Sequence, residues 1–309
     1  MKKKFKVKAD VYQQVTDRIV AGLESKGLQW FRPWDSGQGW ESPINNATGK
    51  PYKGINVMFL SIEQMDKSYE NSEWLTYKQA TTKGGNVKKG EEGTGIVFWN
   101  INFHDPETNK YYRKFEQVPP DAQGRIRKIF SPRIWNVFNI AQCEGIEAVR
   151  EKVTAVGNFT PIERAELVYT QYPVELRPTL KLGGPSAFYV PSRHHVQMPK
   201  PETFVTNADY YKTLFHELVH STGHETILNR LTKVAAFGSE DYSKEELVAE
   251  IGAQFLVGLT GIEPKDDHVN SQAYINNWVK KLKEAPKMAL SAATQAMKAV
   301  DFMTSTPAK

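Results

Sequence analysis

Three histidines and a glutamate lie within the ten residues FHELVHSTGH, from Phe215 to His224, in a chain that has only seven histidines. His216 and His220 are four residues apart, so on a helix they share one face and can bring two imidazoles to one metal ion. Glu217 lies on the flank, where a carboxylate can take a proton from metal-bound water. This HExxH spacing predicts a metal site with Glu217 as general base, although so short a pattern also recurs by chance.

A catalytic zinc site needs a third protein ligand and an open position for water. A second helix, predicted from Ser243 to about Leu259, carries Glu246 and Glu250 on one face. This pair resembles the second half of the glutamate-zincin pattern. That pattern implies Glu246 as the third ligand and Glu250 as the acceptor of a hydrogen bond from a metal-bound histidine. In the alternative, Ser243 and Glu246 form a capping box at the start of the helix, which leaves Glu250 as the ligand.

The metal that we expect is Zn²⁺, with another divalent ion such as Mn²⁺ as the alternative. The third histidine of the motif, His224, follows Gly223, which we expect to end the helix. We therefore assign His224 to packing or capping. His194 and His195 fall on a predicted strand, where exposed positions are the commoner case.

Local patterns also predict the elements that position this site. The motif helix should begin at Asn207 as its N-cap and end at Gly223. Before it, AFYV and HHVQM are typical of two strands joined by a turn at Pro191. We expect the segment from His195 to Met198 to be the edge strand of a small sheet above the motif helix, open to an extended peptide.

The first half of the chain has a different character. Residues 1–155 hold 24 Lys and Arg against 18 Asp and Glu, and they contain six of the seven tryptophans. Cations for phosphates and flat rings for exposed bases are what a groove for single-stranded DNA needs. The alternative is that the tryptophans are core residues and the lysines are solvated.

Two glycine-bearing turns, NATGKPYKG and GGNVKKGEEG, place cations beside aromatic residues. We expect the DNA groove to lie around them, although both are also compatible with ordinary solvated turns. The predicted DNA-binding residues are Trp40, Lys50, Tyr52, Lys53, Lys88 and Lys89.

Composition sets further limits. An apolar fraction of 40% with 24% charged residues is ordinary for a globular protein. No apolar run approaches the length of a membrane span, and the basic N-terminus lacks the apolar stretch of a secretory signal. The single cysteine, Cys143, excludes an internal disulfide. We therefore expect a cytoplasmic protein without a membrane partner.

The length favours two domains, both of the α+β class. We expect an N-terminal single-stranded-DNA-binding domain over residues 1–150 and a zincin-like metallopeptidase domain over residues 158–309. The composition changes near residues 145–160, but no Gly/Ser-rich linker marks the boundary, so the halves are free to pack on each other.

Several separate blocks in order resemble the ArdC family of plasmid antirestriction proteins over nearly the whole chain. In the first half they are SPINNATGKPYKGIN, WLTYKQATTKGGNVKKGEEGTGIVFW and PRIWNVFNIAQCEGI. In the second half they are AFYVPS, YYKTLFHELVHSTGH and YSKEELVAEIGAQFL. The resemblance carries over His216, His220, a glutamate ligand and Glu217.

This resemblance implies a single-stranded-DNA-binding domain followed by a zincin-like domain akin to Spartan-type proteases. It also implies protection of incoming conjugative DNA from host restriction. A component of the host restriction system is a candidate protein substrate. Two alternatives stay open: a Spartan-like protease that acts on DNA-bound proteins, and a non-catalytic DNA-masking protein with a structural metal. The intact Glu217 argues against the latter, since a structural site needs no general base.

Overall fold

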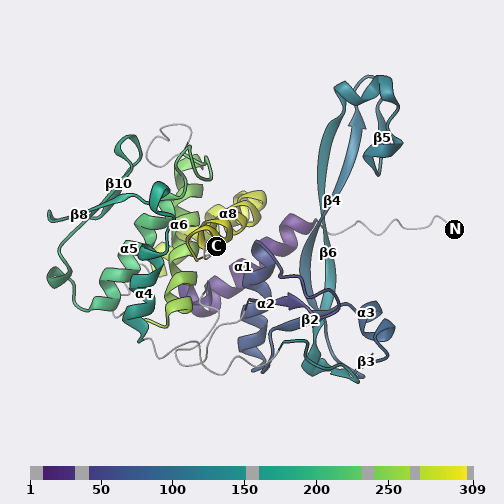
Figure 1. The fold of residues 1–309 in the computed structure, drawn as a ribbon, viewed down its shortest axis with the longest axis horizontal. Helices are drawn as coiled ribbons and strands as arrows, with labels where there is room; N and C mark the ends of the chain where they lie inside the picture. Colours follow the sequence, from purple (N-terminus) through teal and green to yellow (C-terminus); the bar gives the residue numbers. More distant parts are fainter. Residues whose placement is uncertain (1–9, 32–41, 151–159, 232–239, 265–271, 305–309) are drawn as a thin grey trace.

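A computed structural model describes residues 10–31, 42–150, 160–231, 240–264 and 272–304. It confirms the predicted α+β class, with helices and strands in both halves of the chain (Figure 1). The α-helices are α1 (Val11–Lys26), α2 (Ile55–Asp66), α3 (Tyr77–Thr82), α4 (Pro161–Thr170), α5 (Asn207–Ser221), α6 (Glu240–Thr260), α7 (Gln272–Glu284) and α8 (Pro286–Thr304). Within the described residues, no helix combines the length and apolar character that a membrane span requires.

The strands form three sheets. A five-stranded sheet has the order β1-β2-β6-β4-β5, a three-stranded sheet has the order β8-β10-β9, and β3 pairs with β7. The strands are β1 (Ile44–Asn45), β2 (Glu73–Leu75), β3 (Asn86–Val87), β4 (Thr94–Asp105), β5 (Lys110–Tyr112), β6 (Arg127–Asn139), β7 (Cys143–Glu144), β8 (Thr179–Leu182), β9 (Phe188–Val190) and β10 (His195–Met198).

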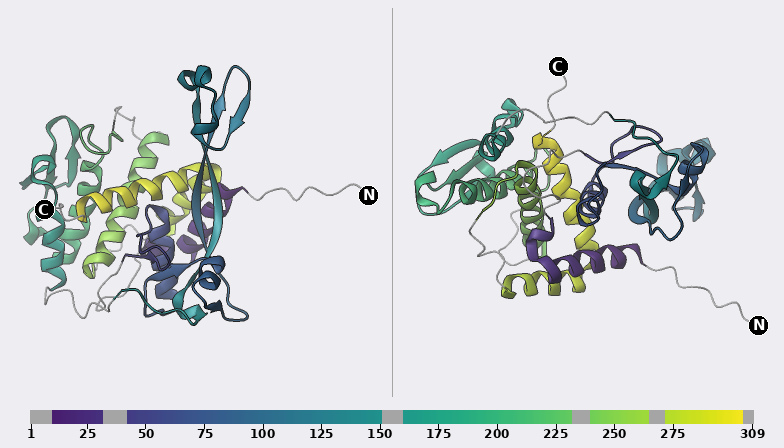
Figure 2. Two further views of the ribbon diagram at one scale, coloured as in Figure 1. Left: turned by 45° about the vertical axis from the view of Figure 1, so that its right-hand side comes forward. Right: turned by 90° about the horizontal axis from the view of Figure 1, so that it is seen from below.

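The antiparallel pair β4–β6 is the longest ladder in the described structure, running without interruption from Thr94 opposite Val137 to His104 opposite Arg127. At its base, α2 covers the open edge of β4, where the Asn56 side-chain amide hydrogen-bonds both the N–H and the C=O of Val97. Beyond this base the ladder leaves the rest of the molecule, as Figures 1 and 2 show. We call residues 98–135, which include the outer ladder and its tip, the arm.

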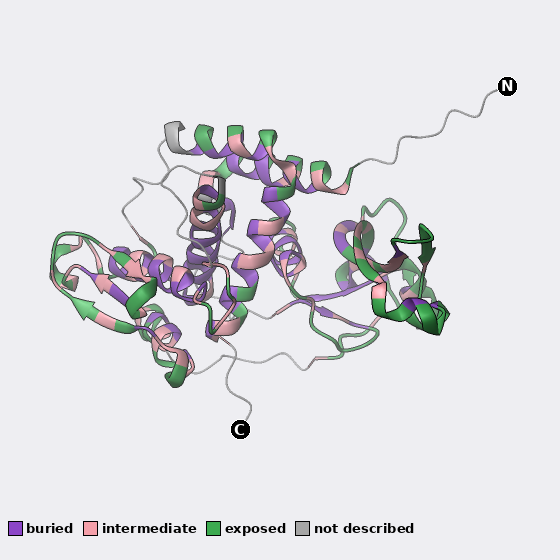
Figure 3. Ribbon diagram, turned by 90° about the horizontal axis from the view of Figure 1, so that it is seen from above, coloured by how far each residue is buried: buried purple, intermediate pink, exposed green. Residues whose placement is uncertain are grey.

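The tip of the arm is held together by a buried carboxylate. Both oxygens of Asp105 accept hydrogen bonds from the Arg125 guanidinium at 2.9 Å, and Thr108 donates a further hydrogen bond at 2.8 Å. Val118 and Ala122 of the tip are also buried. The tip is therefore a small folded unit. In the ladder between the tip and the base, residues 98–104 and 127–133 are exposed or partly exposed and none is buried, in contrast to the largely buried faces of the body's helices (Figure 3).

The first helix lies against the last part of the chain. Asp10 caps α1, and Gly27 ends the helix with a positive φ of 59°. The buried face of α1 packs against α7 and α8, and the Thr16 hydroxyl donates to the Pro286 carbonyl at 3.0 Å. One hydrophobic core runs from Val15 in α1 to Met303 in α8. The two halves therefore share a core.

Helix α6 is the centre of the second half. Its residues from Leu247 to Gly258 are buried all round, as expected for a helix whose apolar residues do not keep to one face. Helices α4, α5 and α8 pack around it. Because α6 begins at Glu240, Ser243 lies inside the helix, where its hydroxyl accepts a hydrogen bond from Lys281 Nζ at 2.9 Å. The capping-box alternative at Ser243 and Glu246 is therefore wrong.

The strand prediction was correct in position but wrong in sheet order. Strands β9 and β10 pair antiparallel on either side of a turn at Pro191–Arg193, as the sequence indicates. However, β10 also pairs in parallel with β8, so the segment from His195 to Met198 is the central strand and cannot accept a peptide. The edge beside α5 is β9. His195, expected to be exposed, is buried.

A glycine permits a close approach between α5 and α6. A methyl group at Gly252 would lie 2.7 Å from Cγ2 and 3.1 Å from Cγ1 of the buried Val219. Gly→Ala normally stabilises an exposed helix interior by about 1 kcal/mol. We expect Gly252→Ala to have the opposite effect and to lower the free energy of unfolding by about 1–3 kcal/mol, measured by urea denaturation.

A control and a second substitution make this prediction specific. Gly124→Ala should have little effect, because nothing lies within 4 Å of the added methyl group. Adding Val219→Ala to Gly252→Ala should cost less than the two single changes together, since the smaller side chain removes the clash. Strictly additive effects would show that the two helices do not meet at this point.

Candidate functional site

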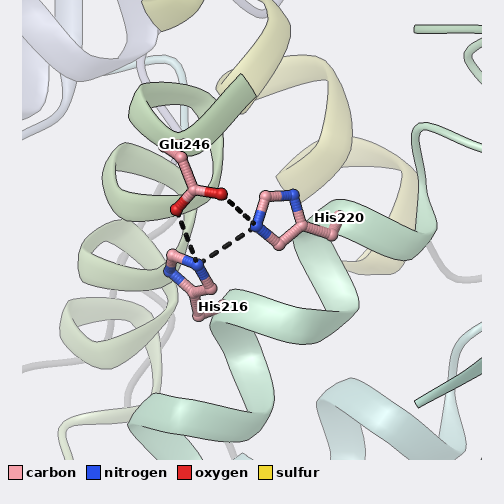
Figure 4. A group of neighbouring side chains, drawn as sticks. All are labelled: His216, His220 and Glu246. Atoms are coloured by element: carbon pink, nitrogen blue, oxygen red, sulfur yellow. Dashed lines mark hydrogen bonds and ion pairs between the residues drawn. The ribbon is translucent and has the colours of Figure 1, made fainter. Parts of the chain in front are cut away.

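The candidate site lies where α5 and α6 face each other. Thr206, rather than the predicted Asn207, caps α5, with its hydroxyl accepting from the Asp209 N–H at 3.2 Å. The helix places His216 and His220 on the face that meets α6, one turn apart. Figure 4 shows both rings pointing toward the Glu246 carboxylate on α6.

The three side chains converge with atoms at similar separations. His216 Nε2 lies 3.1 Å from His220 Nε2, and the Glu246 oxygens lie 3.7 Å from His216 Nε2 and 3.6 Å from His220 Nε2. Among the described residues, these form the one cluster whose ligand atoms can surround a metal ion. Tetrahedral zinc bonds of about 2.0–2.2 Å separate neighbouring ligands by about 3.3–3.6 Å, so the arrangement fits a small divalent cation.

A carboxylate also lies at the far nitrogen of each imidazole. Glu250 Oε1 is 3.6 Å from His216 Nδ1, and Glu245 Oε1 is 3.4 Å from His220 Nδ1. A carboxylate in this position favours the tautomer that leaves Nε2 free to bind a metal. Glu250 was predicted to lie beside a histidine in this way. Glu245 was not predicted, although it precedes Glu246 directly in SKEEL.

An arginine fixes Glu245. Arg230 donates from Nε to Glu245 Oε2 at 3.1 Å and from Nη2 to Oε1 at 2.9 Å, a bidentate pair. Its guanidinium also donates to the Thr222 hydroxyl and to the Val219 carbonyl at the end of α5. Arg230 is almost completely buried, and it links α5, α6 and the segment between them. No sequence signal identified it, because it is an isolated arginine outside any helix.

The acidic surroundings control protonation of the site. Burial lowers the pKa of His216, but the hydrogen bond to Glu246 and the nearby charges of Glu250 and Glu217 outweigh this effect and raise it to about 9. Burial acts to raise the pKa of Glu246, yet His216 and His220 bring it below the ordinary glutamate value. In the metal-free protein, a proton on His216 therefore balances part of the negative charge.

Glu217 lies beside the histidines but outside the cluster of three. Its side chain is buried, and this burial raises the pKa of the carboxyl despite the opposing effect of His216 and His220. A hydrogen bond from the Tyr189 backbone reaches the same carboxylate. Glu217 thus lies between the histidine pair and the edge strand β9.

His224 and His194 form a separate pair. Their ring centroids are 4.5 Å apart. His194 donates from Nε2 to the Leu176 carbonyl and accepts from the Tyr189 hydroxyl, both at 2.8 Å. His224 Nδ1 accepts from the Thr226 N–H in the turn after α5. His224 therefore has a packing role, one of the two roles predicted from the sequence.

The residues predicted to bind DNA are spread over the first half. Lys50, Lys53 and Lys89 are exposed, and so is Lys88, whose Nζ donates to the Ala141 carbonyl at 2.9 Å. Tyr52 packs against two core clusters, and its hydroxyl accepts from Asn45 at 3.1 Å, which gives it a structural role. Trp40 lies outside the described residues. Contact of these residues with DNA stays a prediction.

Two family models match different parts of the chain. The N-terminal domain of anti-restriction factor ArdC matches residues 9–138, and a zincin-like metallopeptidase matches residues 165–295. Two Escherichia coli proteins named DNA primase TraC are 34% and 32% identical over 96% of this chain, but the chain spans only 27% and 20% of their lengths. The uncharacterized protein y4eC of Sinorhizobium fredii (strain NBRC 101917 / NGR234) is 30% identical over 95% of this chain and 91% of its own.

Solved structures agree with these matches. The Mn(II)-bound crystal structure of the antirestriction ArdC protein from plasmid R388 has a TM-score of 0.69 and 30% identity, and the match covers 97% of this chain and 99% of that one. The metal-free structure of the same protein has a TM-score of 0.66 and 31% identity, with 95% and 96% covered. The fold therefore has a counterpart among solved structures, and one of these structures is bound to Mn(II).

Removing different members of the site should weaken metal binding to different degrees. The double change His216→Ala with His220→Ala should abolish stoichiometric metal in elemental analysis, and Glu246→Gln should come closest to this loss. Glu245→Gln removes the carboxylate beside Nδ1 of His220, and Glu250→Gln removes the carboxylate beside Nδ1 of His216. We expect each to weaken metal binding by about 10–100-fold, measured by chelator competition.

Glu24→Gln is the matched control, because Glu24 pairs with Lys283 on the exposed surface at 3.0 Å. Its metal affinity should equal that of the unchanged protein. If Glu250→Gln lost metal while Glu246→Gln kept it, the choice of third ligand would be wrong.

Metal affinity should also depend on pH. The pKa of His216 in the metal-free fold, about 9, lies above its ordinary value of 6.5. The stability from this proton is therefore complete below pH 6.5 and is lost as the pH rises through 9. A metal must displace the proton, so affinity should increase by up to about tenfold per pH unit between 6.5 and 8.5. Chelator competition at several pH values tests this, and a flat profile would contradict it.

Proposed function

Because the chain belongs to the ArdC family of antirestriction proteins, we propose that it binds single-stranded DNA with its first half and protects incoming conjugative plasmid DNA from host restriction. We further propose that the second half is a metal-dependent peptidase whose substrate is a protein, for example a component of the host restriction system. The excess of cations and tryptophans in residues 1–155 supports the DNA-binding part.

The position of Glu217 carries the peptidase part of the proposal. A divalent metal, with Zn²⁺ favoured by the donor set and Mn²⁺ as the alternative, would be held by His216, His220 and Glu246 and would polarise a carbonyl and activate water. Glu217 borders this cluster without belonging to it. Its pKa is raised by burial, which brings a general base closer to neutral pH.

The edge strand β9 supports a peptide substrate. The described structure pairs β9 with β10 on one side only, so its other edge can accept an extended chain by strand addition. A hydrogen bond joins the Tyr189 backbone of β9 to Glu217. A peptide held along β9 would therefore pass beside the general base, the role first predicted for the segment from His195 to Met198.

The substitution Glu217→Gln tests this proposal. It keeps the shape of the side chain but removes the base, so the protein should retain its metal and lose about 10²–10⁴-fold in peptide hydrolysis. Hydrolysis is measured on a restriction-system protein bound to single-stranded DNA. Protection is measured as conjugation efficiency into a restricting host and should fall with hydrolysis.

Three outcomes separate the parts of the proposal. Full protection by Glu217→Gln would refute a role for proteolysis and favour DNA masking. Loss of metal from the variant would show that Glu217 is a ligand. An unchanged protein that fails to bind single-stranded DNA would refute the first half of the proposal.

A further inference from the structure

The β4–β6 ladder gives the arm two chemically different faces. In an antiparallel pair, directly opposed residues share a face and alternate residues along a strand point to opposite sides. Phe98 lies opposite Arg133 and His104 lies opposite Arg127, so these four share one face with Trp135, two residues from Arg133. The ladder has no bulge between these pairs, so this division holds along its whole length.

The first face combines rings with cations. Phe98 and Trp135 are each 52% exposed, and their ring centroids are 6.4 Å apart in an edge-on arrangement. Near the tip, exposed Tyr111 lies 4.5 Å from the His104 ring. We call this the basic aromatic face; its members are Phe98, His104, Tyr111, Arg127, Arg133 and Trp135.

The cations of this face are available for a ligand. Arg127 and Arg133 are exposed, and neither forms an ion pair with any acidic residue that the structure describes. The only acidic residue in β4 and β6 is Asp105, which Arg125 neutralises. Between the two arginines, the opposed Asn100 and Ser131 offer amide and hydroxyl groups. The basic aromatic face therefore has an unopposed positive charge with polar groups at its centre.

The second face is mainly apolar; Lys128, opposite Phe103 near the tip, is its one charged residue in the β4–β6 ladder. Trp99 lies opposite Pro132 and Ile101 lies opposite Phe130, with no charged residue at these positions. Trp99 is 38% exposed and Phe130 is 56% exposed. We call Trp99, Ile101 and Phe130 the apolar face.

The arm needs a partner on physical grounds. A two-stranded ribbon is marginally stable alone, and among the described residues the helices of the body leave this one uncovered (Figure 2). Exposed rings beside unpaired arginines suit a flexible polyanion with flat groups, which describes a single nucleic-acid strand. From Phe98 to His104 the face extends about 20 Å, enough for several nucleotides. In a duplex the bases are already stacked and cannot cover these rings.

We infer that the basic aromatic face of the arm is a binding surface for single-stranded nucleic acid, on which bases stack against Phe98 and Trp135 and phosphates contact Arg127 and Arg133. This inference rests on the proposed single-strand binding and moves its centre away from the lysine-bearing turns predicted from the sequence. The apolar face takes no part in this contact.

The two faces provide a matched experiment. Each carries one exposed tryptophan and one exposed phenylalanine, so Phe98→Ala with Trp135→Ala can be compared with Trp99→Ala with Phe130→Ala in the full-length chain. The probe is a fluorescent oligo-dT 20-mer followed by anisotropy. We expect the first pair to weaken binding at least about tenfold and the second to change it less than about threefold. Trp135→Phe should keep most of the affinity, because a ring remains.

The arginines are tested by their salt dependence. Arg127→Gln with Arg133→Gln should lower the slope of log affinity against log salt by about 1.4, whereas Phe98→Ala with Trp135→Ala should leave it nearly unchanged. Thermal melting of each variant shows that the fold is intact.

Specific results would overturn the inference. They are equal losses for the two faces, a larger loss for the apolar face, or duplex DNA binding as tightly as the single strand. If the unchanged protein bound oligo-dT and both aromatic pairs were inert, the inference would fail while the proposed single-strand binding would stand. If the unchanged protein did not bind it, both would fail.

Discussion

The close contact between α5 and α6 is the constraint on which the candidate metal centre depends. Gly252 lets the two helices approach until Val219 fills the space that a side chain would need. Only at this separation can carboxylates from α6 reach both imidazoles of α5. Because α6 is buried all round by α4, α5 and α8, its position is fixed by packing from several sides. The geometry of the site is thus a consequence of core packing.

Charge balance is the second requirement of the site. Three glutamates of α6 lie against two histidines, and such a cluster would be unstable without positive charge nearby. Arg230 supplies one fixed charge through its bidentate pair with Glu245, and it lowers the pKa of that carboxyl together with His220. On His216, a proton supplies the positive charge while the metal is absent. The site is therefore organised for a cation, and its affinity for one is linked to pH.

The candidate metal site and the arm lie at opposite ends of one shared body. Figure 1 shows α5 and α6, which carry the candidate metal ligands, on one side and the arm on the other, with α1 and α8 between them. Helix α1 belongs to the first half in sequence but packs on the last helices of the chain. A fragment ending near residue 150 would expose the face of α1 that α7 and α8 cover. Experiments on either region therefore need the full chain.

The sequence by itself determined the local features. Helical spacing predicted the shared face of His216 and His220, and strand-forming residues on both sides of a turn at Pro191 predicted β9 and β10, because these patterns depend on near neighbours. The tertiary structure decided everything that depends on how elements meet. Glu245 and Glu246 are adjacent in the sequence. Only the orientation of α6 places Glu245 beside Nδ1 of His220, where Arg230 also binds it, and Glu246 near the Nε2 atoms of both histidines. The parallel pairing with β8 made β10 a central strand. The arm exists because β4 and β6 extend beyond the helices that cover their base. A local sequence pattern does not show where the neighbouring elements end.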